Sequence, residues 1–148
     1  MKISTKGRYG LRILMDLAIH QSEKPRLIRD IAKSQQISEK YISRLVIALR
    51  KAGMIRSVRG VNGGFHIAMK PEDITLLDVI EVMEGPLSIV DCVSTPKRCK
   101  LSENCAPREF WCKLNDDIRS LMRGTTLADI LAAYDRQNAL NGSTDYCI

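Results

Sequence analysis

The spacing of apolar residues changes at Gly53, and this change limits the possible fold more than any other feature of the chain. Before Gly53 the spacing is that of three helices, over residues 7–21, 27–32 and 39–51. After it come two short segments of strand composition, residues 54–58 and 65–68. Between them lies Asn62-Gly63, a dipeptide typical of hairpin turns that require positive φ. Residues 1–70 are therefore predicted to form a helix-turn-helix with a β-hairpin wing, within a mainly α fold.

The third predicted helix has two chemically different faces. Ser38 is a favourable N-cap for it, and its apolar side chains fall on one side, namely Ile42, Leu45, Val46 and Leu49. Lys40, Ser43 and Arg44 fall on the other side. In helix-turn-helix proteins the outward face of this helix enters the major groove, so these three residues are predicted to contact bases or nearby phosphates. A helix face that is merely solvated is the alternative.

The tip of the predicted wing carries an arginine among glycines, at residues Arg59, Gly60, Asn62 and Gly63. An arginine on such a tip is suited to the minor groove of DNA, where the negative potential is enhanced. The distribution of charge agrees with this reading. Residues 1–70 hold 15 Lys and Arg against 4 Asp and Glu, whereas residues 71–148 hold 8 against 13. A basic half joined to an acidic half indicates a part that binds a polyanion and a part with another role.

Several classes of protein are disfavoured by what the sequence lacks. No apolar run approaches the length of a membrane span, and the first residues lack the apolar stretch of a secretory signal, so a cytoplasmic protein is expected. The sequence contains no C-x-x-C, nucleotide-binding loop or substrate-pocket motif, so an enzyme, including a redox enzyme that uses thiols, is not expected.

The second half contains a cysteine-rich segment without periodicity. Residues 73–84 read as a helix, but residues 85–105 show no regular spacing and include Cys92, Cys99 and Cys105, with Cys112 shortly after. Structural disulfides are not expected in the cytosol, and a bound metal would order such a loop. The wide spacing lacks the tight knuckle of most zinc sites and favours an iron–sulfur cluster over zinc, which stays open as the alternative.

A further helix is predicted to follow Pro107. Its apolar stripe consists of Phe110, Trp111, Leu114, Ile118, Leu121 and Met122. The stripe fits either an ordinary core helix or a helix that pairs with a second copy of the chain. The second reading is favoured because helix-turn-helix proteins usually bind palindromic operators as dimers. Residues 71–136 are thus expected to hold the cofactor loop and the dimerisation region, and residues 137–148 a polar tail.

An ordered set of motifs resembles the IscR/CymR type of bacterial winged-helix regulators, the Rrf family. The motifs are ISTKGRYGL (3–11), ISEKY (37–41), SVRG (57–60) with Gly63-Gly64, LDVI (77–80), MEGPL (83–87) and TLADI (126–130). The resemblance covers about residues 1–134 and extends the expected DNA contacts to Thr5, Lys6, Tyr9 and Ser38. Many relatives have Glu-Gln where this chain has Ser43-Arg44. That departure predicts a different preferred operator.

The resemblance also implies ligands for a cluster. In members similar to IscR, three cysteines of this loop hold an iron–sulfur cluster, and Cys92, Cys99 and Cys105 match their positions. A 2Fe–2S cluster is favoured over a 4Fe–4S cluster. At the two positions that supply the fourth ligand in relatives, this chain has Arg108 and Arg8, which cannot serve as ligands. The open candidates for that place are Cys112, Glu103, Glu109, Asp91 or an external ligand, while Cys147 is expected to be a free thiol of the tail.

Three functions fit these features, and the first of them is favoured. The first is a homodimeric repressor that senses iron–sulfur status and controls genes for cluster assembly and cysteine desulfurase. The second is a regulator of cysteine metabolism of the CymR type, acting through a protein partner such as a cysteine desulfurase or an enzyme of cysteine synthesis. A DNA-binding module stabilised by zinc, with no sensing role, is a third reading.

Overall fold

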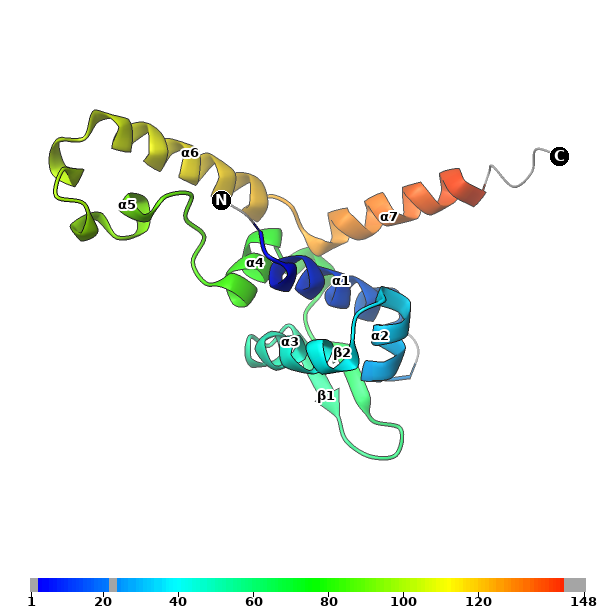
Figure 1. Cartoon of the computed structure of the whole chain (residues 1–148). Coiled ribbons are helices and arrows are strands. Elements are labelled where there is room, and N and C mark those ends of the chain that lie inside the picture. Colours follow the sequence, from blue (N-terminus) through cyan, green and yellow to red (C-terminus); the bar gives the residue numbers. More distant parts are fainter. Residues whose placement is uncertain (1–2, 22–23, 143–148) are drawn as a thin grey trace.

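The computed structural model describes residues 3–21 and 24–142. Its first half consists of three helices and a hairpin, α1 (Thr5–Ile19), α2 (Ile28–Gln35), α3 (Glu39–Lys51), β1 (Ile55–Val58) and β2 (Gly64–Ile67). The predicted winged helix-turn-helix, in a mainly α fold, is confirmed (Figure 1).

Local side-chain chemistry explains where these helices begin. Ser4 caps α1 by accepting a hydrogen bond from the Lys6 amide, and Ser38 caps α3 by accepting one from the Tyr41 amide. Between α2 and α3, Gln36 adopts the left-handed conformation with φ of 54°, which turns the chain sharply. Helix α3, the recognition helix of the helix-turn-helix, therefore starts where its sequence predicts.

The core of this half lies between α1, α3 and α4 (Leu76–Glu84). The inward face of α3 is buried as predicted, at Ile42, Leu45, Val46 and Leu49. Each such side chain contributes about 1.5–3 kcal/mol when fully buried. Helix α4 crosses α1 so closely that a Cβ at Gly10 would lie 2.7 Å from the Met83 side chain. Glycines on α1 therefore set the distance between the two helices.

The wing is a two-stranded antiparallel sheet in which Ile55 pairs with Ile67 and Val58 with Gly64. The predicted turn at Asn62-Gly63 with positive φ is wrong in its detail. The tip is a five-residue loop closed by a hydrogen bond from the Gly63 amide to the Gly60 carbonyl, and positive φ occurs at Gly60 and Gly64. A glycine on each side of the loop supplies the conformational freedom, so Asn62 need not.

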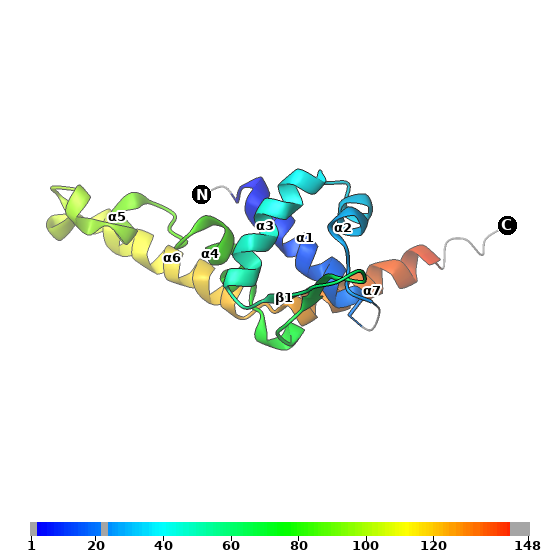
Figure 2. The ribbon, with the colours of Figure 1, turned by 90° about the horizontal axis from the view of Figure 1, so that it is seen from below.

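The second half extends from the winged helix in two directions, with the cysteine-containing segment and the long helix after it on one side and the last helix on the other (Figures 1 and 2). After a 3₁₀ turn, η1 (Pro71–Asp73), helix α4 leads into short elements, α5 (Asp91–Ser94), η2 (Pro96–Arg98) and η3 (Ser102–Asn104). Two longer helices follow, α6 (Ala106–Arg123) and α7 (Leu127–Gly142). The helix predicted from residue 73 begins only after Thr75, which forms a capping box with Asp78.

Two expectations about this half need adjustment. The segment 85–105 has no long element, as expected, but its chain is folded into three single turns. The stretch from residue 137, expected as a polar tail, is helical as far as Gly142, while Cys147 lies outside the described residues. No helix within residues 3–21 and 24–142 is long and apolar enough to cross a membrane.

The apolar stripe of α6 is only partly covered. Met122 is buried and Ile118 packs beside it, but Phe110 and Leu121 are each 71% exposed and Trp111 is 43% exposed. An apolar face this open is unusual for a core helix, and it is available for contact with another surface.

Candidate nucleic-acid interface

The outward face of α3 meets the beginning of α1 at a basic groove. Lys40 and Arg44 are exposed, and Arg44 lines a cavity of about 390 Å³ together with Lys6 and Tyr41. Three residues predicted to contact DNA (Lys6, Lys40 and Arg44) thus occupy adjoining parts of two helices. Cations placed this way can hold a phosphate beside the helix that enters the major groove.

A small polar and aromatic cluster fixes the first turn of α1 against α3. The Thr5 hydroxyl lies 3.2 Å from the Tyr41 hydroxyl, and the Tyr9 and Tyr41 rings meet edge to face at 5.9 Å. The Arg12 guanidinium stacks over the Tyr9 ring at 5.5 Å. The structure therefore brings Thr5 and Tyr9, predicted from the family motif, to the side of the recognition helix.

The two predicted serines are engaged within their own helix. The Ser38 hydroxyl caps α3, and the Ser43 hydroxyl donates to the Glu39 carbonyl at 2.8 Å. A base contact by Ser43 would have to use its remaining acceptor capacity or break this bond. On this face Lys40 and Arg44 therefore offer the stronger chemistry for recognition, beside the 58% exposed side chain of Ile47.

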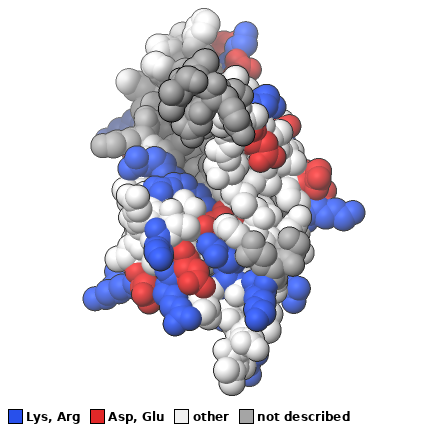
Figure 3. All heavy atoms as spheres, turned by 90° about the vertical axis from the view of Figure 1, so that its right-hand side faces the viewer, with Lys and Arg blue, Asp and Glu red and all other residues white. Residues whose placement is uncertain are grey.

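The wing carries a second, separate group of predicted residues. Arg59, Gly60 and Asn62 are exposed at its tip, whereas Gly63 is buried at the base of the loop. Figure 3 shows Lys and Arg side chains spread over the lower half of one face, where the winged helix lies. The outward face of α3 and the wing tip thus carry two separate groups of exposed basic residues.

Glu84, which sequence reasoning left without a role, joins the end of α4 to the beginning of α1. Its carboxylate accepts hydrogen bonds from the backbone amides of Ser4 at 2.8 Å and Gly7 at 3.2 Å. Burial raises the pKa of Glu84, but these bonds and the charge of Lys6 outweigh it, so the pKa lies below its usual value. A glutamate in the last turn of a helix interacts unfavourably with the helix dipole. That unfavourable position could have indicated, from the sequence, that Glu84 has a hydrogen-bonding partner in another element.

The segment that follows Glu84 contains Cys92, Cys99 and Cys105, which like Cys112 of α6 are half-buried and free of disulfides. Its chain is tied to α6 at two points. Asn115, which is 5% exposed, accepts a hydrogen bond from the Ile89 amide, and the Arg108 guanidinium donates to the Cys92 carbonyl at 3.2 Å. The cysteine loop (residues 86–105) lies along the far half of α6, well away from the wing (Figure 1).

The donor chemistry of this loop suits a soft metal or a cluster, because Cys92, Cys99 and Cys105 supply three thiols within one short segment. Their positions do not yet form a site. Among residues 3–21 and 24–142 no three Cys, His, Asp or Glu side chains lie close enough together to hold a metal ion. Single-turn elements separate the thiols, so ligation would require the loop to rearrange.

The start of α6 determines where Cys105 and Cys112 lie relative to each other. Cys105 is the N-cap residue, directly before the helix, and Arg108 stands in its first turn. Two turns of helix separate Cys105 from Cys112, a rise of about 10.5 Å. Because Cys105 lies outside the helix, Cys112 stays an open candidate for the fourth ligand.

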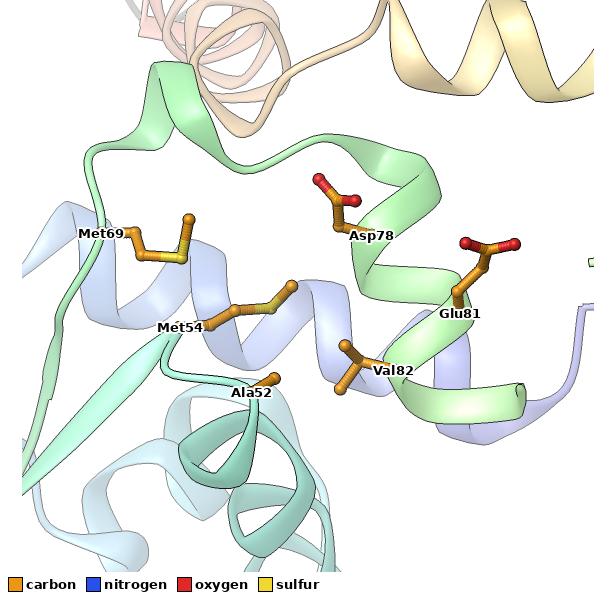
Figure 4. A pocket seen from close by; sticks show the side chains of 6 residues that line it. All are labelled: Ala52, Met54, Met69, Asp78, Glu81 and Val82. Atoms are coloured by element: carbon orange, nitrogen blue, oxygen red, sulfur yellow. The ribbon is translucent and has the colours of Figure 1, made fainter. Parts of the chain in front are cut away.

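A second cavity, of about 490 Å³, lies where the end of α3, the start of β1 and α4 meet (Figure 4). Met54, Met69 and Val82 form its apolar wall, and Asp78 and Glu81 stand on the α4 side. Both carboxylates are already engaged. Asp78 accepts from Thr75, and Glu81 accepts from the Leu87 amide and from Arg119 of α6. Glu81 therefore links α4, α6 and the start of the cysteine loop.

The chain is similar throughout to known regulators. The family model described as "Rrf2: Iron-dependent Transcriptional regulator" matches residues 3–133. The HTH-type transcriptional regulator CymR of Bacillus subtilis is 42% identical over 90% of this chain and 91% of its own length. The HTH-type regulator IscR of Aliivibrio salmonicida is 33% identical over 93% of this chain and 85% of its own.

Solved structures agree with the sequence comparison. CymR, the global cysteine regulator of B. subtilis, aligns with a TM-score of 0.76 at 38% identity, covering 90% of this chain and 98% of CymR. IscR of T. potens aligns with a TM-score of 0.72 at 36% identity, covering 90% of this chain and 88% of that one. These relatives are regulators of transcription, which confirms the expectation that the chain is not an enzyme. The chain belongs to the Rrf2 family of transcriptional regulators.

Proposed function

We propose that the protein is a cytoplasmic, homodimeric repressor that senses iron–sulfur status and controls genes for cluster assembly and cysteine desulfurase. The observation that carries this proposal is the pairing of a basic winged helix with a separate loop of three thiols. Lys40, Arg44 and the wing residue Arg59 would contact operator DNA. The exposed side of α6 would pack on a second copy of the chain.

In this proposal Cys92, Cys99 and Cys105 hold the cluster after the loop rearranges, with 2Fe–2S favoured over 4Fe–4S. A bound cluster supplies iron–thiolate bonds whose formation is coupled to the folding of the loop. The chain's own contribution is to convey the state of that loop to the DNA-binding half. Glu81 accepts from Leu87 at the beginning of the loop, and Glu84, one turn of α4 further, accepts from the first turn of α1.

These carboxylates give the loop a short route to Lys6 and the basic groove. A shift of the 86–105 segment moves the end of α4, and Glu84 conveys that movement to Ser4 and Gly7, on either side of Lys6. Coupling of about 1–3 kcal/mol through such a route changes DNA affinity about 5–150-fold. The proposal does not require the cluster to approach the DNA.

The test is metal and sulfide analysis of protein purified without oxygen. Stoichiometric iron and acid-labile sulfide, with visible absorption, are expected in the wild type. Replacing all three of Cys92, Cys99 and Cys105 with alanine should abolish them but leave a folded protein by circular dichroism. Cys147→Ala, at the thiol expected to be free, is the matched control for loss of a thiol. A colourless wild-type protein with one zinc per chain would refute the cluster.

The comparisons support one other function. CymR of B. subtilis is described as a global cysteine regulator, and its identity to this chain is higher than that of the IscR sequence given above. On this alternative the protein responds to cysteine status through a protein partner, a cysteine desulfurase or an enzyme of cysteine synthesis. Wild-type protein that binds DNA equally well with and without reconstitution by iron and sulfide would favour it.

A further inference from the structure

A buried acid on α1 holds an arginine that belongs to the connection before α2. The side chain of Asp16 is 1% exposed, and the Arg26 guanidinium donates to it twice, at 2.9 Å from Nε and 3.3 Å from Nη2. Ser34 and Gln35 of α2 also donate to this carboxylate. A buried pair of this kind is a weak source of net stability but a strong constraint on geometry.

The backbone of the same arginine holds the wing. The Arg26 amide donates to the Phe65 carbonyl at 3.0 Å, and the Phe65 amide donates to the Arg26 carbonyl at 2.9 Å. Arg26 thus pairs with the edge of β2 that β1 leaves open. One residue is bound to α1 through its side chain and to the wing through its main chain.

Gly64 makes this backbone approach possible. Its φ is +153°, and a Cβ at this position would lie 2.6 Å from the Arg26 carbonyl oxygen. No side chain can occupy that space without moving the two segments apart. A two-stranded hairpin alone is only marginally stable. Its orientation relative to the helices therefore depends strongly on its attachment at Arg26.

We propose that Asp16 and Arg26 act as positioning residues for DNA binding: they fix the wing at the angle that brings Arg59 to the minor groove. Ser57 pairs with Phe65, so the Arg59 backbone lies two residues, about 7 Å, beyond the point of attachment. A rotation of the hairpin there by about 10° moves the Arg59 backbone by about 1 Å. Neither Asp16 nor Arg26 touches DNA in this arrangement. The inference rests on the wing contact of the proposed function.

We call the contacts of Arg26 with Asp16 and with Phe65 the clamp, and a double-mutant cycle tests it. Arg26→Gln removes the positive charge that pairs with Asp16. Gly64→Ala pushes the backbone of β2 away from the Arg26 backbone and leaves that charge in place. Each variant is combined with Arg59→Ala. Affinity is measured by fluorescence anisotropy with a labelled A·T-rich duplex of about 30 base pairs at about 50 mM salt. Arg123→Gln, an exposed arginine at the end of α6, is the matched control for lost charge.

Each clamp variant should weaken binding by about fivefold to tenfold in the wild-type background and by less than about twofold when Arg59 is already alanine. Arg26→Lys, which keeps the charge, should restore part of the loss, and the control should bind like the wild type. Circular dichroism and thermal unfolding establish that each variant is folded. If Arg26→Gln fails to fold, Gly64→Ala combined with Arg59→Ala completes the same cycle.

Two outcomes separate the clamp from the proposed function. Equal losses with and without Arg59 would mean that the clamp variants act elsewhere, and the inference would be overturned while the wing contact stands. Wild-type affinity of Arg59→Ala would instead refute the wing contact itself, and the clamp with it.

Discussion

Replacement of Asp16 by asparagine should lower the free energy of unfolding by about 3 kcal/mol at neutral pH. The variant keeps the shape of the side chain but removes its charge, and it turns one acceptor into a donor that faces other donors. Breaking a buried pair costs about 3–5 kcal/mol. The lower end applies here, because the Arg26 side chain is 17% exposed and can turn towards water.

The pH dependence gives this prediction its sign. Burial raises the pKa of Asp16, but hydrogen bonds from Arg26, Ser34 and Gln35, with the charge of Arg26, outweigh it and hold the pKa below its usual value. A carboxyl with a lowered pKa in the folded state contributes stability above its unfolded pKa of about 3.9, and that contribution is lost as the pH falls through the folded value. The difference between wild type and variant should therefore be present at neutral pH and shrink below about pH 4.

Urea unfolding, followed by circular dichroism at a fixed protein concentration, measures the difference at each pH. Asp117→Asn, an exposed acid on α6, serves as the control and should change stability by less than about 0.5 kcal/mol. A loss below about 1 kcal/mol at neutral pH, or a difference that persists undiminished in acid, would show that the carboxylate is not ionised and paired as described.

Three further results are expected. Arg44→Ala and Arg59→Ala should each weaken DNA binding and reduce the slope of log affinity against log salt by about 1; an unchanged slope would remove that residue from the phosphate contacts. Glu84→Ala should destabilise the fold by about 1 kcal/mol through loss of the α1 cap, more than Glu84→Gln, which keeps an acceptor; equal values in urea unfolding would contradict the hydrogen-bond assignment. Phe110→Ser combined with Leu121→Ser should make the protein monomeric in sedimentation equilibrium, and a dimer that persists would place its interface elsewhere.

Features fixed by nearby residues could be predicted from the sequence. The recognition helix begins at Glu39 after its Ser38 cap, and both wing strands lie within one residue of their expected limits, because caps and apolar alternation act over a few positions. The wing turn was mispredicted because a favourable dipeptide, Asn62-Gly63, lay inside a longer loop that two other glycines shape.

Contacts between distant segments could not be predicted in this way. Ser4 and Glu84 are 80 residues apart, and their bond depends on how α1 and α4 cross. Asp16 did leave a signal, an acid within the apolar face of a helix, but nothing local identifies Arg26 as its partner. For the cysteine loop, residue type indicates thiolate chemistry, whereas the relative positions of the thiols depend on packing that periodicity does not encode.

The division of α3 into two faces has a consequence for how such regulators diverge. Its inward side chains belong to the core, whereas Lys40, Arg44 and Ile47 project outward. Exposed substitutions usually change stability by less than about 0.5 kcal/mol. A duplicated gene can therefore exchange these outward residues one at a time and acquire a new set of target promoters while every intermediate protein still folds.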